Sequence, residues 1–398
     1  MHDRTNGDET QSLTPRRDTW PRVLLVSQRN LSDQVANACL YQFEDLLCTL
    51  DDVDLIAPGR SVILPGKLYK LARWCGVPRQ LARAVTLRPQ VAEPAREYEL
   101  LIAVLDSYRQ VATVNTIKQW RRHCHKAICF FPEIWPRDID TRNSLLELFD
   151  VFDHIFVGVD HCSEALTKLI GRPCTNLHPA VDALQFCPRP SIRRSIDVCY
   201  IGRRSEVTHQ RLLALAEDKE LFYYYDTAKG SLRIADHRAH RLLFANLVKR
   251  SRYFIANYAK IDRPDQTGGK QEVGYRFFEG VAGGAVLLGQ PPATAAFRRL
   301  FPWPDAVIEI PFDAPGVVEV IAGLDGDPAR TARIRAANVA NALRLHDWVY
   351  RYEEMLAVAG LASTPAMADR QARLQALADR FEHAPCDEAA AAPHRIPA

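Results

Sequence analysis

Short apolar runs recur along the chain, each followed by a helix-like pattern, and this alternation limits the possible folds most strongly. In the first half the runs are nearly uninterrupted, as in Leu100–Leu105 and Ala127–Phe131. Uninterrupted apolar strands are covered on both faces, and their alternation with helices predicts a parallel, doubly wound sheet. The other strands expected here are Val23–Val26, Asp54–Ala57, Ile155–Val157 and Cys174–Leu177, separated by helical segments that include 32–47 (capped by Ser32), 111–123 and 162–170.

A second series of the same kind follows residues 182–190, where two prolines in a polar run indicate a linker. The sequence therefore predicts an α/β protein with two Rossmann-like halves. The strands expected in the second half are Asp197–Ile201, Leu221–Tyr225, Tyr253–Ile255, Ala285–Leu288 and Ala306–Ile310, with helices near 208–219, 237–250, 275–282, 317–324 and 335–358.

The chain has 398 residues, which is too long for one core of ordinary size. We expect a first domain over residues 20–185 and a second over 191–330. Helices over 331–382 are expected to cross partly back to the first domain. Residues 1–19 and 383–398 read as disordered tails because they are polar or rich in alanine and proline.

Composition narrows the function classes. With 47% hydrophobic and 25% charged residues and a net charge of +3, the chain resembles an ordinary soluble protein, and no nucleic-acid partner is expected. No run approaches the roughly 20 apolar residues of a membrane helix, and the N-terminus lacks a signal peptide's apolar core. The ten cysteines show no C-x-x-C spacing, which favours reduced thiols and a cytoplasmic protein.

The stretch Gly268–Gly289 carries charged residues in a short helix that leads directly into an apolar strand, where packing alone would favour apolar residues. Two glycines and Lys270 precede a short helix in which Arg276 and Glu279 lie three residues apart, on one face. Glycines and an apolar strand follow. A helix N-terminus offers free N–H groups to a phosphate, and Arg276 would add cationic charge there. The alternative is an ordinary surface ion pair.

Gly202, Arg203 and Arg204 directly follow a predicted strand of the second half. The glycine allows a ligand to approach the backbone, and guanidinium groups suit phosphate. Two solvated arginines on a loop are the alternative, since a lone Gly-Arg is a weak signal.

Arg-x-x-Glu followed by small residues and an apolar strand resembles the nucleotide-sugar motif of GT-B glycosyltransferases. It is most similar to glycosyltransferase family 4 and the related spore-maturation-protein-like group. The resemblance implies two Rossmann-like domains facing a central cleft, with Glu279 on the ribose of the donor. Gly202 and Arg203 match the family's Gly-Arg at the donor diphosphate, which Arg203, Arg204 and Arg276 would neutralise. Lys260, Lys270 or Arg276 could replace the lysine that the family usually adds there.

Two positions depart from the family pattern. Family 4 enzymes usually carry a lysine where this chain has Thr208, and a glutamate where it has Gln271, next to Glu272. These departures motivate an alternative, a non-catalytic GT-B relative that serves as a binding or scaffold subunit. A dehydrogenase is disfavoured because no G-x-G-x-x-G follows Val23–Val26.

The function implied is sugar transfer from a nucleotide-diphosphate sugar to an acceptor hydroxyl, in polysaccharide or glycoconjugate biosynthesis. Arginines and a helix N-terminus can stabilise the leaving diphosphate without a metal. By resemblance, the reaction is then expected to be metal-independent and retaining. Beyond the nucleotide sugar no cofactor is expected.

Residues that would bind the acceptor are harder to identify from the sequence. Glu133 and Trp135 leave a predicted strand at the crevice, where a carboxylate could orient a hydroxyl and an indole could stack on a sugar. A proline-terminated strand with a half-buried tryptophan is the alternative. Glu272 is the second candidate catalytic carboxylate, and Asp106 with Arg109 occupies a comparable loop.

No metal site is expected. The Asp-x-Asp pairs are interpreted as capping or solvated residues, and the histidine groups lack four convergent ligands. The sets weighed are Asp52/Asp54, Asp138/Asp140, Asp325/Asp327, His123/His125/Cys129 and His237/His240.

Residues 60–90 contain seven Lys or Arg and no Asp or Glu, interleaved with apolar residues. The stretch fits peripheral contact with an anionic membrane at its inner face, capture of an anionic acceptor, or a solvated face. Two kinds of acceptor molecule are compatible with the sequence, a glycan and a lipid-linked molecule.

Overall fold

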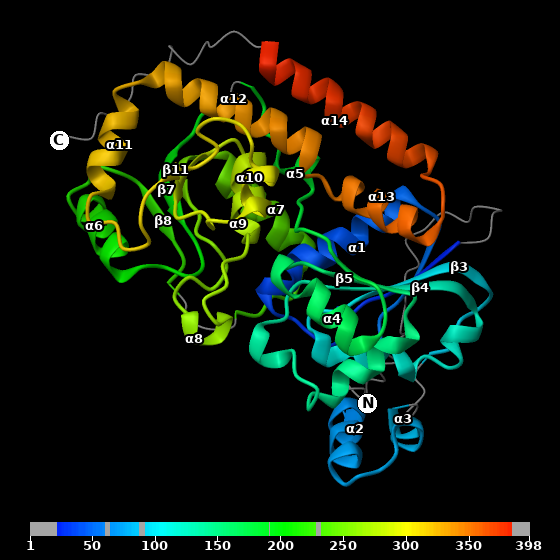
Figure 1. Cartoon of the computed structure of the whole chain (residues 1–398). Helices are drawn as coiled ribbons and strands as arrows, with labels where there is room; N and C mark the ends of the chain where they lie inside the picture. Colours follow the sequence, from blue (N-terminus) through cyan, green and yellow to red (C-terminus); the bar gives the residue numbers. More distant parts are fainter. Residues whose placement is uncertain (1–21, 60–63, 87–91, 191, 228–231, 384–398) are drawn as a thin grey trace, which may run out of the picture.

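The computed structural model describes residues 22–59, 64–86, 92–190, 192–227 and 232–383. Its first half holds a six-stranded sheet in the order β2-β1-β3-β4-β5-β6, in which every pairing is parallel (Figure 1). The strands are β1 Val23–Val26, β2 Val53–Ile56, β3 Tyr98–Val104, β4 Cys124–Phe131, β5 His154–Val157 and β6 Cys174–Asn176.

The second half holds a five-stranded sheet in the order β11-β10-β9-β7-β8, again with parallel pairing throughout. The prediction of two Rossmann-like, doubly wound sheets is therefore confirmed. Its strands are β7 Ile196–Tyr200, β8 Tyr223–Tyr225, β9 Ser251–Ile255, β10 Val286–Gly289 and β11 Ile308–Glu309.

Helices join the strands of the first half and cover both faces of its sheet. The α-helices are α1 Ala38–Leu50, α2 Leu64–Trp74, α3 Arg79–Thr86 and α4 Ser163–Ile170. Short 3-10 helices occupy many of the loops: η1 Val35–Asn37, η3 Tyr108–Thr116, η4 Trp120–Arg122, η5 Pro136–Asp138, η6 Ser144–Val151 and η7 Asp160–Cys162.

The linker carries one short helix, and the second half continues to the end of the described chain with longer ones. These are α5 Ala183–Phe186, α6 Glu206–Glu217, α7 His237–Lys249, α8 Pro264–Thr267, α9 Tyr275–Ala282, α10 Ala295–Leu300, α11 Val317–Asp325, α12 Pro328–Leu345, α13 Trp348–Ala359 and α14 Pro365–His383.

β1 shows why the apolar runs fold as strands. All four of its residues have no exposed surface. Val23 and Leu25 point into the cluster that includes α1 and α13, whereas Leu24 and Val26 point into a second cluster on the other face. A strand covered on both faces has no polar positions to alternate with, so its sequence reads as a continuous apolar run.

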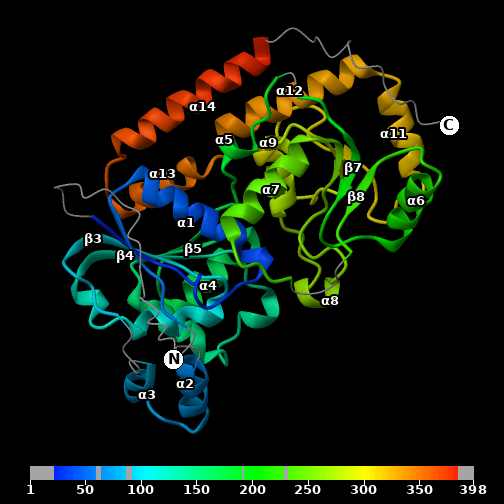
Figure 2. The ribbon, with the colours of Figure 1, turned by 180° about the vertical axis from the view of Figure 1, so that it is seen from behind.

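The C-terminal helices lie along both halves of the molecule. Figure 2 shows α13 beside α1 and α14 running along α12. The ring of Trp348, in α13, lies 4.6 Å from that of Phe43, in α1, and the Tyr352 hydroxyl donates a hydrogen bond to Asp51 at 2.5 Å. The helix that follows the second domain in sequence therefore packs on the first.

Several local predictions are wrong. Ser32 does not cap α1, because α1 begins at Ala38 and Asn37 occupies its N-cap position. The Ser32 hydroxyl accepts a hydrogen bond from the Asn37 side chain. The segment 111–123 forms two 3-10 helices rather than one α-helix. The predicted helix 335–358 is broken after His346, where Asp347 caps α13 by accepting a hydrogen bond from the N–H of Val349.

α14 extends to His383, the first residue of the predicted C-terminal tail. The remainder of both predicted tails, and residues 60–63 and 87–90 of the basic stretch, lie outside the described residues. In the part of the chain that is described, no helix is long and apolar enough to span a bilayer.

Candidate functional site

Each sheet has a point at which the strand order reverses. In the first sheet the chain moves from β1 to β2 on one side and then to β3 on the other, and the second sheet repeats this at β7 and β9. Ligands of doubly wound sheets bind in the crevice past the carboxyl ends of the strands at such points. The loops concerned are 27–30 and 106–110 in the first half, and 202–204 and 256–274 in the second.

Loops of the two halves contact each other at these ends. The backbone N–H of Val35 donates to the carbonyl of Leu232 at 2.8 Å, and that of Ile234 donates to Asp33 at 2.8 Å. Further contacts from the loop after β9 reach the loops after β4 and β5, as described below. The crevices of the two sheets therefore face one another.

Glu279 lies on α9 and is buried, with 1% of its surface exposed. Its two carboxylate oxygens are bound by two arginines. Arg241 Nη1 lies 2.5 Å from Oε1, and Arg276 Nη1 lies 2.5 Å from Oε2. Burial alone would raise the pKa of Glu279, but the two guanidinium groups outweigh it and hold the pKa below its usual value.

The two arginines differ in exposure. The side chain of Arg241, from α7, is 4% exposed, whereas that of Arg276 is 31% exposed. The Arg276 guanidinium lies over the Phe244 ring, 4.6 Å from its centroid. Arg241 is thus a buried counterion, and Arg276 is the member of the cluster that solvent or a ligand can reach.

Gly202 brings the end of β7 next to Arg276. Its φ of +99° lies in the region that favours glycine, and a Cβ built on it would lie 3.9 Å from Nε and Nη2 of Arg276. The structure therefore brings together three of the predicted donor-binding residues, Gly202, Arg276 and Glu279.

The neighbouring arginines of this loop are paired with acids that the sequence analysis did not single out. Arg203 Nη1 lies 2.8 Å from Asp262, and the Arg204 guanidinium is bonded to Asp226. The backbone N–H of Gly202 also donates to Asp226, at 3.3 Å. Arg203 keeps 45% of its side chain exposed, compared with 14% for Arg204.

The positions that depart from the family pattern have local roles in the structure. The Thr208 hydroxyl donates to the carbonyl of Phe312 at 2.7 Å and accepts from the N–H of Ala314 at 2.9 Å. Gln271 accepts a hydrogen bond from the backbone of Ala293 at 2.8 Å. Lys270, beside it, is exposed.

Glu272 is buried at the boundary between the halves. Its Oε2 accepts a hydrogen bond from the N–H of Asp160 at 3.0 Å, and its Oε1 accepts one from the N–H of His161 at 3.1 Å. Nδ1 of His161 lies 2.5 Å from the same Oε1. This carboxylate of the second half therefore satisfies free N–H groups at the start of η7, in the first half.

Glu133 and Trp135 follow β4 and meet the second half through one residue. Lys260 Nζ lies 2.7 Å from Glu133 Oε1 and 4.9 Å from the centroid of the Trp135 ring. Trp135 is almost fully buried and stacks on His161 with ring centroids 5.4 Å apart. Glu133 remains 41% exposed, so this carboxylate is open to solvent whereas Glu272 is not.

The crevice of the first sheet holds buried polar groups that the sequence analysis missed or left open. Gln28 is 1% exposed, and its side-chain amide has no hydrogen-bond partner within the described residues. Burial raises the pKa of Asp106, which accepts a hydrogen bond from Asn37 at 3.3 Å. Glu44 has no exposed surface and binds Ser27 and Arg29, and burial raises its pKa to about 7.

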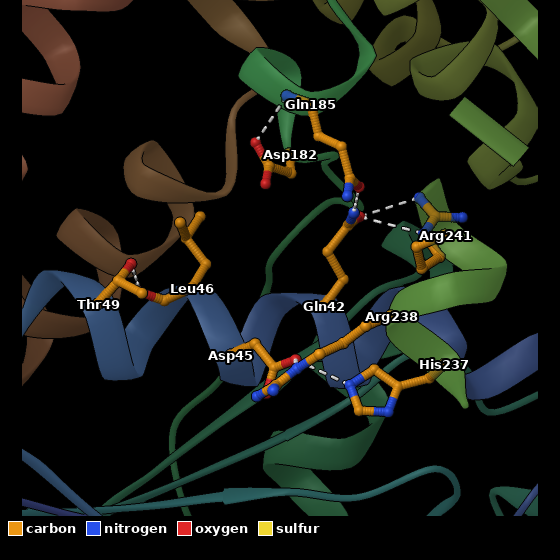
Figure 3. A pocket seen from close by; sticks show the side chains of 9 residues that line it. All are labelled: Gln42, Asp45, Leu46, Thr49, Asp182, Gln185, His237, Arg238 and Arg241. Atoms are coloured by element: carbon orange, nitrogen blue, oxygen red, sulfur yellow. Dashed lines mark hydrogen bonds and ion pairs between the residues drawn. The ribbon is translucent and has the colours of Figure 1, made fainter. Parts of the chain in front are cut away.

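A pocket of about 260 Å³ lies between α1, α5 and α7 (Figure 3). Asp45 of α1 lies 2.8 Å from His237 Nε2 and 2.7 Å from Arg238 Nε, both on α7. Gln42 accepts a hydrogen bond from Arg241 at 3.0 Å. The pocket is therefore lined by both halves and shares Arg241 with the Glu279 cluster. Its lining residues are Gln42, Asp45, Leu46, Thr49, Asp182, Gln185, His237, Arg238 and Arg241.

A family model described as "Glycosyl transferase-like" matches residues 219–357, which include the Arg276 and Glu279 cluster and most of the second sheet. No curated protein sequence matches the chain.

Solved structures resemble the chain over nearly its whole described length. HepE from Anabaena, in complex with UDP-glucose, is 14% identical with a TM-score of 0.51, and the alignment covers 85% of this chain and 99% of that one. An alpha-glucosyltransferase in complex with UDP and DNA is 13% identical with a TM-score of 0.50, covering 85% and 99%. The fold is that of the GT-B glycosyltransferases, and together with the matched domain it classes this protein as a glycosyltransferase.

Proposed function

We propose that this protein transfers a sugar from a nucleoside-diphosphate sugar to an acceptor hydroxyl, with the donor bound on the second sheet. The observation that carries the proposal is the adjacency of Gly202, Arg276 and Glu279 at the reversal point of that sheet. UDP is the first candidate nucleotide, because the two similar structures reported above contain UDP-glucose and UDP, respectively.

Glu279 and Arg276 would exchange partners when the donor binds. A ribose diol donates hydrogen bonds to a carboxylate, and a diphosphate accepts them from a guanidinium. Arg276 would therefore leave Oε2 of Glu279 for the diphosphate, while Arg241 keeps Oε1 and the buried charge stays paired. Gly202 leaves room for the phosphate beside Arg276 because it lacks a Cβ.

The leaving diphosphate gains negative charge as its bond to the anomeric carbon breaks. Arg276, Arg203 and the exposed Lys270 would together stabilise that charge without a metal ion. The acceptor oxygen forms a bond to the anomeric carbon, the bond from that carbon to the diphosphate oxygen breaks, and the acceptor proton leaves with the diphosphate. Transfer on the face of the departing diphosphate retains the anomeric configuration.

Glu133 is the proposed acceptor-side carboxylate, because it is exposed and stands across the boundary from Lys260. It would orient the attacking hydroxyl as a hydrogen-bond acceptor. Glu272 would act through His161, by holding the ring and the start of η7 in place against the second half.

Calorimetric titration with UDP, GDP and ADP tests the donor site. The Arg276→Met protein is expected to bind the preferred nucleotide at least tenfold more weakly than the unchanged protein. Arg330→Met is the matched control, since that arginine is 41% exposed and paired with Asp305 in the same half. Equal affinity in the Arg276 variant contradicts the assignment.

Turnover is a separate measurement. Mass spectrometry of candidate donor sugars incubated with the protein is expected to show slow hydrolysis. Proton NMR of the sugar anomer that is first released reports the stereochemistry. Nucleotide binding without transfer or hydrolysis of any donor would favour the non-catalytic alternative. Activity that disappears with EDTA and returns with Mg²⁺ would contradict a metal-independent reaction.

A further inference from the structure

The helical hairpin formed by α2 and α3 projects from the first domain at the end remote from the second sheet (Figures 1 and 2). Four large apolar side chains on it are solvent-exposed: Leu68 by 37%, Leu71 by 55%, Trp74 by 84% and Leu81 by 66%. Ten exposed large apolar residues occur in the described part of the chain, so nearly half of them lie on this one hairpin. Leu68, Leu71 and Trp74 lie three residues apart along α2 and therefore share one helix face, and an exposed apolar face of this kind marks a contact surface.

The hairpin is firmly held on its inner side. Arg73 Nη2 lies 3.0 Å from Glu147, and Arg79 and Arg83 are both bonded to Asp150. Both acids lie on η6. Tyr69 is fully buried and donates a hydrogen bond to Glu147 at 2.9 Å. The exposed apolar residues are therefore displayed on a fixed scaffold, and three of the cations in this basic stretch are neutralised at its base.

The outer face of the hairpin keeps its positive charge. Lys67 and Lys70 are exposed beside the leucines and Trp74, and no Asp or Glu occurs between residues 64 and 86. We define the outer face by its six exposed residues, Lys67, Leu68, Lys70, Leu71, Trp74 and Leu81.

We propose that this outer face docks the protein on an anionic lipid bilayer, with Trp74 and the leucines inserted at the headgroup boundary. Tryptophan prefers that boundary, leucine enters the acyl region, and lysines extend to lipid phosphates. The apolar area on offer is on the order of a few hundred Å². A stable protein interface needs roughly 800 Å² on each partner, so the area suits shallow insertion better than dimerisation.

The proposal rests on the hairpin alone and holds whether or not the sugar-transfer proposal is correct. The full-length protein is expected to sediment with vesicles of phosphatidylcholine and phosphatidylglycerol, and much less with phosphatidylcholine alone. Binding is expected to shift tryptophan emission to the blue, since Trp74 is exposed whereas Trp120, Trp135 and Trp348 are buried. Trp74→Phe is expected to bind vesicles without that shift.

Two sets of variants separate insertion from charge. Leu71→Ser with Trp74→Ser is expected to weaken vesicle binding about tenfold or more, because two apolar side chains no longer leave water. Phe222→Ser, which removes an equally exposed apolar residue from the second half, is the matched control and is expected to change nothing. The protein with Lys67→Gln and Lys70→Gln is expected to bind phosphatidylglycerol-containing vesicles roughly fivefold more weakly for each lysine removed. It therefore loses most of its preference for them.

The proposal is overturned if the unchanged protein binds neither kind of vesicle, or if the double serine variant binds as well as the unchanged protein. A dimer in light scattering that the double serine variant makes monomeric, with no vesicle binding, would assign the outer face to a second copy of the chain instead.

Discussion

Oε1 of Glu272 lies 2.5 Å from Nδ1 of His161, across the boundary between the two halves of the chain. The same carboxylate accepts hydrogen bonds from the backbone N–H groups of Asp160 and His161. Glu272 belongs to the loop that leads into α9, the helix that carries Arg276 and Glu279. This contact between the halves and the Arg276–Glu279 pair of the candidate donor site therefore lie on one continuous segment.

Glu272→Gln is expected to destabilise the protein, because an amide has only one oxygen to accept from two backbone N–H groups. Hydrogen bonds to a charged group contribute about 1.5–3 kcal/mol, so we expect a loss of roughly 2 kcal/mol in the free energy of unfolding. Chemical denaturation monitored by circular dichroism measures it. Glu354→Gln, at a side chain that is 52% exposed, serves as the control, and equal losses in both variants would contradict the role of Glu272.

The two arginines of the Glu279 cluster are expected to separate stability from donor binding. Arg241→Met leaves a buried carboxylate short of a counterion and is expected to cost about 3 kcal/mol of stability or more. Arg276→Met, at a side chain that is 31% exposed, is expected to cost about 1 kcal/mol. Thermal and chemical unfolding check both values, and a reversed order would refute the assignment of Arg241 as the structural partner.

Glu44 is expected to make stability depend on pH. Burial raises its pKa from 4.5 to about 7 in the folded protein, so the folded state holds a proton that the unfolded state has lost. Stability from this group is therefore full below about pH 4.5 and is lost as the pH rises to about 7, by roughly 3 kcal/mol. Unfolding measured across that range is expected to show a smaller pH dependence in Glu44→Gln, and identical profiles would exclude Glu44 as the cause.

Gly202→Ala and Gly171→Ala form a matched pair. Both glycines have positive φ, at +99° and +73°, so alanine is strained in either position by about 1–2 kcal/mol. A Cβ at Gly202 would approach the Arg276 guanidinium, whereas no atom lies within 4 Å of a Cβ at Gly171. Similar losses in melting temperature are expected, with a severalfold rise in the KM for the donor only in Gly202→Ala. Steady-state kinetics with a fixed acceptor decides this.

The two sheets could be predicted from the sequence because their central strands, such as β1, β3 and β10, are covered on both faces and read as apolar runs. The candidate donor loop could be found for a related reason, since Gly202 lies two residues beyond the end of β7 and Arg276 lies one turn from Glu279. Local pattern carries both kinds of information.

The partners that complete the site could not be read in the same way. Arg241 precedes Glu279 by 38 residues on a different helix, and His161 is 111 residues from Glu272. Only the packing of α7 on α9, and of one half on the other, creates those pairs. The sequence could not show that Arg73, Arg79 and Arg83 point towards the rest of the first domain. Their carboxylate partners lie on η6, more than 60 residues later, and no sequence pattern links that segment to the hairpin.

The packing of α13 on α1 has a consequence for biosynthesis. Phe43 is made early, yet its partner Trp348 emerges from the ribosome only after the whole second sheet has been synthesised. Until then the apolar side chains of α1 that α13 covers lack this partner, so the first domain can complete its core only late in translation.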